Sequence, residues 1–282
     1  MGDVLAGFHA AWEFESDSVL IRYERGIRTP KLLQVLGERR IPLEALADVT
    51  LTPGRRGTVV LRAEPRPGAD PLMEAAAGQL KEACDPYRLV LPAERETLAE
   101  YYADELRALL TESGPAERHL VAAPEPPLQF KAYDGKASFD GTSVFFRWFW
   151  TGASSAKWKA GDQTFEVTDL AGVEWRSPEV FEGYLRLLRR DGAAPPAQAD
   201  QDPAAVVFGL GYGAVHESLP LAAAVLAAVR ERGPVAALPV AAARRDPADI
   251  AERIRHLGEL HQAGLVTDEE FSAKKAQLLA EL

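Results

Sequence analysis

Histidine, cysteine and serine are the residues most often used for catalysis and metal binding, and their spacing here predicts neither. The five histidines are His9, His119, His216, His256 and His261. None of them stand four residues apart, the spacing that places two metal ligands on one helix face. With one cysteine, Cys84, an intramolecular disulfide and a cysteine-based zinc site within one chain are excluded. We therefore predict no catalytic, metal-binding or cofactor-binding residues, and a protein that is not an enzyme.

A glycine-rich stretch, GLGYG at 209 to 213, has a superficial likeness to a nucleotide-binding loop. Such a loop connects a strand to a helix in a parallel βαβ unit, and the surrounding sequence lacks that pattern. The serines likewise lack the Gly-x-Ser-x-Gly turn of a hydrolase nucleophile. We interpret the glycines as part of a last strand and turn.

A dense aromatic stretch, DGTSVFFRWFW at 140 to 150, offers another kind of chemistry. Its rings suit a membrane wedge, a platform for a ligand or a buried strand. The choice among these depends on the elements that position the rings. An internal repeat in the sequence identifies these elements.

Two units of the sequence follow the same order. The segment SVLIR at 18 to 22 matches SVFFR at 143 to 147, LADV at 46 to 49 matches LAGV at 170 to 173, and DPYRLVL at 85 to 91 matches DPAAVVF at 202 to 208. Each unit reads as short strands followed by one helix, with Thr97 and Ser218 as predicted N-caps. This order favours an α+β fold that is mainly β.

Aligning the units assigns the faces of the aromatic strand. Val144, Phe146 and Trp148 fall on the positions of Val19, Ile21 and Tyr23, and residues that alternate in this way share one face of a strand, here the predicted core face. A membrane wedge is disfavoured because the rings begin inside a repeated strand. Phe149 and Trp150 stay unassigned; if they are exposed, we expect a contact between the two units or between subunits.

The second unit, with FDG at 139 to 141, SVFFR, FEVTDLAGVEW at 165 to 175 and GYLRLLRR at 183 to 190, resembles the tandem bacterial repeats known as domain of unknown function 4429. The first unit departs from that pattern, with FESD at 14 to 17 in place of FDG. The resemblance implies two tandem pleckstrin-homology-like barrels, each closed by a C-terminal helix. The predicted domains are residues 1–113 (first repeat), 114–128 (linker), 129–231 (second repeat), 232–245 (Pro/Ala linker) and 246–282 (helical hairpin).

A basic group in the first unit gains meaning from this resemblance. Some pleckstrin-homology-like folds bind inositol phosphates through basic residues in and beside the first strands, where this chain has Arg22, Arg25, Arg28, Arg39 and Arg40. The resemblance thus implies a candidate anion-binding site. Residues 1 to 62 hold nearly as many acids as bases, so a solvated rim is the alternative interpretation.

The C-terminal residues 246–282 predict two short helices separated by Gly264, with Thr267 and Glu270 as a capping box for the second. Apolar residues line them: Ile250, Ile254, Leu257, Leu260, Phe271, Leu278 and Leu279. The leucines, the central glycine and the Thr-x-Glu-Glu-Phe run resemble the short C-terminal domain called SHOCT. A module of this size seldom buries enough surface to fold alone. Its apolar stripe must therefore cover the preceding domains, a copy of itself or another protein.

Composition and charge limit the partners. The formal charge is −10, which disfavours non-specific binding to nucleic acid, so no nucleic acid is expected. No secretory signal peptide is visible, and we expect a cytoplasmic protein, peripheral to the membrane if it binds lipid. The leading hypothesis is a non-enzymatic interaction or scaffold protein that binds a protein partner and self-associates or docks through the hairpin. The alternative is a peripheral module that binds anionic lipid or a phosphorylated ligand through the first unit's arginines.

Overall fold

The computed structural model describes residues 3–180, 182–192, 194–209 and 211–232. All of them belong to one compact unit, Met1–Pro234. The predicted hairpin of 246–282 lies outside the described residues, and so do its apolar residues Ile250, Ile254, Leu257, Leu260, Phe271, Leu278 and Leu279. The expectations for the tail therefore stay predictions.

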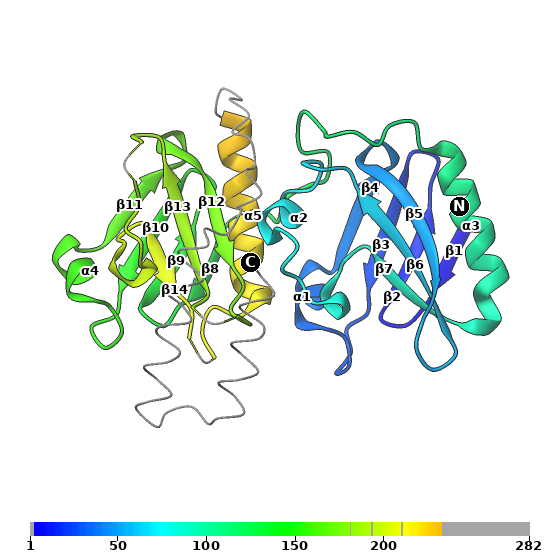
Figure 1. Cartoon of the computed structure of the whole chain (residues 1–282), viewed down its shortest axis with the longest axis horizontal. Helices are drawn as coiled ribbons and strands as arrows, with labels where there is room; N and C mark the ends of the chain where they lie inside the picture. The colour runs from blue at the N-terminus through cyan, green and yellow to red at the C-terminus, as the bar shows by residue number, and fades with distance from the viewer. Residues whose placement is uncertain (1–2, 181, 193, 210, 233–282) are drawn as a thin grey trace, which may run out of the picture. The chain divides into compact units, whose positions relative to one another are not determined.

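The first repeat forms two antiparallel sheets (Figure 1). The first sheet contains β1 (Asp3–Ala6), β2 (Ala10–Phe14), β3 (Ser18–Tyr23) and β4 (Glu38–Pro42), and the second contains β5 (Leu46–Pro53), β6 (Thr58–Pro65) and β7 (Arg88–Pro92). The helices are α1 (Lys31–Leu36), α2 (Pro71–Ala76) and α3 (Glu96–Leu109). Short 3-10 turns occupy Leu43–Ala45, Glu82–Cys84 and Ala93–Arg95.

The second repeat has the same strand order. Its four-stranded sheet contains β8 (Leu128–Lys131), β9 (Gly135–Phe139), β10 (Ser143–Trp148) and β11 (Gln163–Glu166), and its three-stranded sheet contains β12 (Leu170–Arg176), β13 (Tyr184–Arg189) and β14 (Ala205–Val207). The helices are α4 (Ser155–Ala160) and α5 (Val215–Arg232), with 3-10 turns at Val167–Asp169 and Ala199–Gln201. Among the described residues this repeat has a 3-10 turn, and no α-helix, in the connection where the first repeat has α2.

The fold is α+β and mainly β, as predicted, but the predicted closed barrels are wrong. The strands of each repeat form two separate sheets. In the first repeat the chain passes from one sheet to the other through the 3-10 turn Leu43–Ala45, where regular strand pairing ends. An isolated bridge between Phe8 and Val90 joins the loop before β2 to β7 of the other sheet.

The predicted core faces are correct. Val144, Phe146 and Trp148 of β10 are buried, as are their counterparts in β3. The register is also the same, because Ser18 pairs with Pro42 on β4 and Ser143 pairs with Glu166 on β11. The aromatic stretch therefore begins as a core strand with one exposed side, and its last residue, Trp150, is exposed in the loop that follows β10.

The repeats also share an ion pair, which is half-buried in the first repeat and buried in the second. Its residues align between the two units, but the alignment does not show that they pair. Arg62 Nε lies 2.9 Å from Asp85 Oδ2, and Arg186 Nε lies 3.0 Å from Asp202 Oδ2. Each aspartate also accepts a hydrogen bond from the backbone N–H two residues later. The pair thus fixes the chain before the last strand to the middle strand of the three-stranded sheet.

The closing helices differ in how they are covered. Helix α3 packs against β5 and β6 with one side, whereas α5 packs against its own sheets and also against α1 and α2 of the first repeat. The predicted caps are wrong: α3 begins one residue before Thr97, and Ser218 is buried inside α5, where Trp175 Nε1 donates a hydrogen bond to it at 3.0 Å. An apolar helix such as α5 is expected where both sides are buried.

Polar contacts complete the junction between the repeats, a name we use for the surface where α1, α2 and residues 79–81 meet α5 and β12. Gln79 donates to the Trp175 carbonyl and accepts from the Ser177 N–H, both at 3.0 Å. Arg230 of α5 forms an ion pair with Glu74 of α2 at 2.9 Å. The second repeat therefore completes its core with side chains of the first, including Leu32 and Leu72.

Candidate functional site: the loop ends of the two repeats

Two findings limit the chemistry of the described residues. Groups of three or more His, Cys, Asp or Glu side chains that could hold a metal ion do not occur among them. Within the same residues, no helix is long and apolar enough to cross a membrane. The candidate sites among these residues are therefore binding surfaces.

The structure does not bring the five predicted anion-binding arginines together as free cations. Arg22 contacts Glu13 and, at 3.6 Å, Glu38, while Arg40 contacts Glu15. These pairs neutralise the outer face of the β1–β4 sheet. Arg25 and Arg28, in the loop after β3, are exposed, and the described residues provide no hydrogen bond or ion pair for them.

Arg39, the fifth member, is a buried structural residue. Its guanidinium makes a bidentate pair with Asp70, at 2.8 and 2.9 Å, and Tyr87 donates a hydrogen bond to the same carboxylate at 2.7 Å. Burial alone favours the neutral acid, but the Arg39 charge holds the pKa of Asp70 below its usual range. Burial raises the pKa of Tyr87 well above normal. With every group paired, this network cannot bind an external anion.

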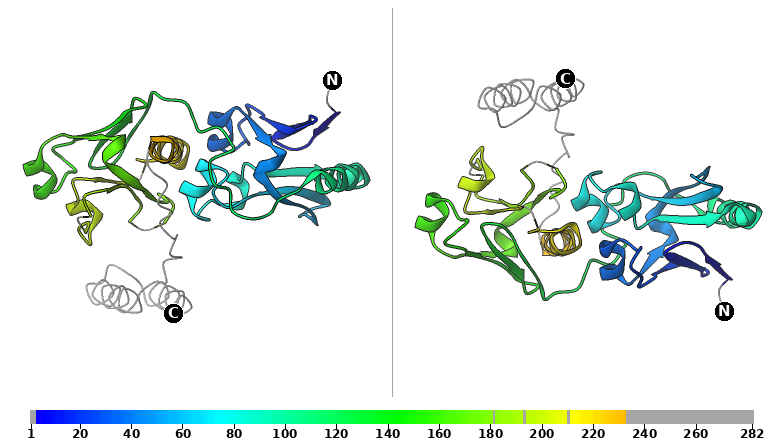
Figure 2. Two further views of the ribbon diagram at one scale, coloured as in Figure 1. Left: turned by 90° about the horizontal axis from the view of Figure 1, so that it is seen from above. Right: turned by 90° about the horizontal axis from the view of Figure 1, so that it is seen from below.

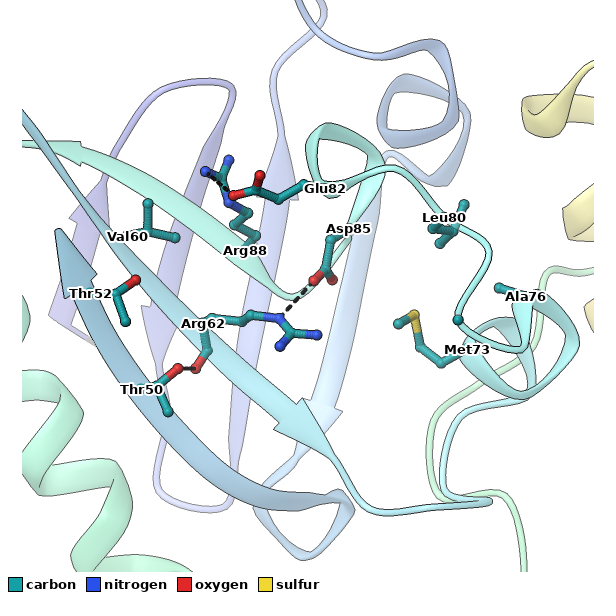
Figure 3. Close-up of a pocket in the computed structure, with 11 residues that line it drawn as sticks. Thr50, Thr52, Val60, Arg62, Met73, Ala76, Leu80, Glu82, Asp85 and Arg88 are labelled. Carbon is teal, nitrogen blue, oxygen red and sulfur yellow. Dashed lines mark hydrogen bonds and ion pairs between the residues drawn. The ribbon is translucent and has the colours of Figure 1, made fainter. Parts of the chain in front are cut away.

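A groove of about 470 Å³ lies on the outer face of the β5–β6–β7 sheet, between the sheet and the segment that follows α2 (Figure 3). Its charged side chains are already paired: Arg62 with Asp85, and Arg88 with Glu82 at 2.8 Å. In the second repeat the corresponding face is closed, because Arg186 is buried and donates to the Pro196 carbonyl. The groove offers polar contacts but no unpaired charge for a ligand.

A buried ion pair lies where α4 meets the turn before β9 in the second repeat. Lys157 of α4 and Asp134, in the turn before β9, are almost fully buried and contact each other. Asp134 also accepts from the Val207 N–H at 2.9 Å, and the Lys157 ammonium lies 5.0 Å from the Trp148 ring centroid. Burial raises the pKa of Asp134 and lowers the pKa of Lys157, while the attraction between the two groups opposes both shifts. The pair fastens α4 and two loops to the sheet.

Four aromatic side chains stand exposed on the elements that this pair fixes. They are Tyr133, Trp150, Trp158 and Tyr212, and we call them the aromatic end. Trp150 is 82 % exposed and Trp158 is 56 % exposed, whereas Phe149 is only half-buried. The rings of Tyr133 and Tyr212 meet edge to face with centroids 6.5 Å apart. Exposed tryptophans on a rigid support are typical of binding surfaces.

A row of cations borders the aromatic end. Lys136 is the direct cross-strand partner of Lys131 on one side and of Arg147 on the other, so the three side chains share the outer face of the sheet. We call them the cationic row. The described residues provide no carboxylate partner for any of them. Like charges directly opposite one another destabilise a sheet. Neighbouring cations of this kind are unusual in a chain with a formal charge of −10.

The equivalent end of the first repeat has a different surface. In register, Arg25 takes the place of Trp150, and Phe8 that of Tyr133. The loop after β3 also carries Ile27, a fully exposed isoleucine between two arginines. The two ends share an exposed aromatic at the position of Phe8 and Tyr133, but the first has arginine where the second has the exposed Trp150.

Sequence reasoning found part of this site. The sequence singles out Phe149 and Trp150 and predicts that, if exposed, they contact the other repeat or another subunit. Other residues form the junction between the repeats. Trp158, Tyr133 and Tyr212 went unnoticed because single aromatics in loops give no periodic signal. The cationic row was hidden because it depends on strand register across three strands.

Comparison with known proteins identifies two families. The family described as Domain of unknown function (DUF4429) matches residues 12–107 and 137–226, together more than half of the 282 residues. The Short C-terminal domain (SHOCT) matches residues 252–279. No curated protein matches the chain. Because the first model covers more than half of the residues, the chain belongs to the DUF4429 family, and it carries a SHOCT domain at 252–279.

Proposed function

We propose that the protein is a non-enzymatic interaction module whose aromatic end binds a protein partner. The observation that carries this proposal is the exposure of Trp150, in the loop after β10, and of Trp158, on α4, beside a buried ion pair that holds this end in place. Tryptophan and tyrosine dominate the binding energy of many protein interfaces. A rigid support lowers the entropy lost on binding.

The same proposal includes a pleckstrin-homology-like fold for each repeat. Its support is the order of a four-stranded sheet, a three-stranded sheet and a closing helix, found twice. This order supports the fold alone, and the proposed binding rests on the side chains of the aromatic end.

The test is a comparison of full-length variants as bait in a pull-down from the source cells. Trp150→Ser combined with Trp158→Ser should lose at least one protein that the unchanged chain retains, and Arg25→Ser, at the position equivalent to Trp150, should keep it. Retention of the same proteins by the double tryptophan variant would refute the proposal. Equal thermal unfolding of the variants confirms that binding, and not folding, has changed.

For the SHOCT domain we propose self-association or docking on another protein, as its apolar stripe predicts. Light scattering of the full chain and of a chain ending at residue 245 tests this. A lower mass for the shortened chain supports self-association. The same mass for both chains, with no partner lost from the pull-down, contradicts the proposal.

A second candidate function rests on the loop after β3. Arg25 and Arg28 are exposed and flank the fully exposed Ile27, a combination suited to an anionic lipid surface. In flotation with phosphatidylserine vesicles, Arg25→Glu with Arg28→Glu should abolish binding, and Arg22→Gln with Arg40→Gln, at the paired arginines, should keep it. A wild-type chain that never floats rules this function out.

A further inference from the structure

Helix α3 carries an apolar stripe that nothing in the described residues covers. Leu98, Tyr101 and Leu109 are 43, 55 and 51 % exposed. Acidic side chains surround the stripe: Glu96, Glu100, Asp104 and Glu105. Of these, Asp104 has an ion pair, with Arg107 on the same helix. The surface is therefore apolar along one line and negative around it.

The second repeat shows what covers this side of the closing helix. When Thr97 is aligned with Ser218, the positions of Leu98, Tyr101 and Leu109 correspond to Leu219, Ala222 and Arg230 of α5. Leu219 and Ala222 are fully buried, and Arg230 pairs with Glu74 of α2. The first repeat packs on α5 through α1 and α2, and the pair of Arg230 with Glu74 places α2 on this side of α5. In the second repeat, this side of the closing helix is buried against the first repeat. The corresponding side of α3 is exposed.

The aromatic end provides a complementary surface. Trp150 and Trp158 supply apolar area, and α4 adds the exposed Lys159. The cationic row lies at the last residues of β8 and β10 and the first residues of β9, next to the turn of Tyr133 and the loop of Trp150. Its unpaired positive charges match the unpaired carboxylates of α3.

These two surfaces cannot meet within one copy. Figure 2 shows α4 on the side of the second repeat away from α5, and α3 on the side of the first repeat away from α2. Since α5 and α2 pack together, the repeats stand between the two surfaces. Contact between them must join different molecules.

We propose that the aromatic end of one copy binds helix α3 of a second copy, which makes the chain its own partner in a head-to-tail assembly. This inference rests on the proposed function, because it names the partner of the aromatic end. The contact is heterologous: each copy uses one surface to bind and offers the other surface to the next copy. The contact resembles the junction within one copy, in which the first repeat covers the closing helix of the second.

The test uses two full-length variants, each with one surface blocked. Trp150→Glu with Trp158→Glu blocks the aromatic end, and Leu98→Arg with Tyr101→Arg blocks α3. In sedimentation velocity, each variant alone should lose this association, with self-affinity reduced roughly thirtyfold or more. An equimolar mixture should form a 1:1 complex through this contact, and further contacts of this kind cannot be added, because one intact surface of each kind remains. Val35→Glu, at an exposed apolar residue of α1 outside both surfaces, should behave as the unchanged chain.

Three results would overturn the inference. A mixture that forms no 1:1 complex denies the pairing of the two surfaces. A variant blocked only at the aromatic end that still dimerises through α3 indicates a symmetric contact. Masses that none of the substitutions change assign all self-association to another region, such as the SHOCT domain. If in these cases a different protein still depends on Trp150 and Trp158, the proposed function stands and only this inference fails.

Discussion

The two repeats share a backbone plan and differ in what their surfaces have to cover. Strand order and register are the same in both, as is the ion pair between the middle strand and the aspartate before the last strand. The first repeat neutralises the arginines of its four-stranded sheet with glutamates, whereas the second leaves the cationic row unpaired. The first also leaves the outer side of α3 exposed, while α5 is buried. Duplication preserved the framework, and divergence is concentrated at the loop ends and closing helices.

The largest expected effect concerns the ion pair that the first repeat alone contains. Asp70→Asn should destabilise the protein by about 3–5 kcal/mol, because it leaves the Arg39 guanidinium buried without its counter-charge. Denaturant unfolding measures the loss. The control is Asp70→Asn combined with Arg39→Met, which removes the buried charge, keeps an acceptor for the Tyr87 hydroxyl and should cost clearly less. Equal costs for the single and double variants would show that the charge is not the cause.

The shared ion pair should matter more in the second repeat. Arg186 and Asp202 are both nearly buried, so Arg186→Met should cost about 3 kcal/mol. The Arg62 side chain is 43 % exposed, and Arg62→Met should cost less than about 1 kcal/mol. The same unfolding measurement compares them. A larger loss at Arg62 would contradict the difference in burial.

Acid should weaken the junction that the second repeat depends on. Burial alone would raise the pKa of Glu74, but His119 and Arg230 lower it below its ordinary value. A carboxylate with a lowered folded pKa stabilises the protein above its ordinary pKa, and this contribution is lost as the pH falls through the folded value. Stability measured from neutral to acidic pH should therefore fall less steeply for Glu74→Gln, which removes about 1 kcal/mol at neutral pH. Parallel curves for the two proteins would exclude this role of Glu74.

The smallest effects should differ in sign between equivalent positions. Arg22→Gln removes exposed pairs with Glu13 and Glu38, and should destabilise by a few tenths of a kcal/mol, roughly 0.3. Arg147→Gln removes a like charge opposite Lys136 and should stabilise by a similar amount. Thermal unfolding at low salt resolves the two. A loss of stability in both variants would mean that the cationic row carries no repulsion.

The repeat, the core faces of β3 and β10, and the mainly β class followed from local patterns in the sequence. Alternation along SVLIR and SVFFR is enough to place Val144 and Phe146 in the core. The separate sheets did not follow, because they depend on where pairing stops. The burial of Arg39 also did not follow, since its partner Asp70 is distant in sequence. The same holds for α5, whose apolar character reflects contacts with the first repeat.

We propose that the aromatic end of the second repeat is a binding surface and that the equivalent end of the first repeat is not its duplicate. The most direct measurement compares Trp150→Ser with Arg25→Ser, two changes at the same position of the repeat, by sedimentation velocity and by partner retention. We predict that Trp150→Ser weakens association and that Arg25→Ser leaves it unchanged. Equal behaviour of the two variants, whether both associate normally or both fail, would contradict the account.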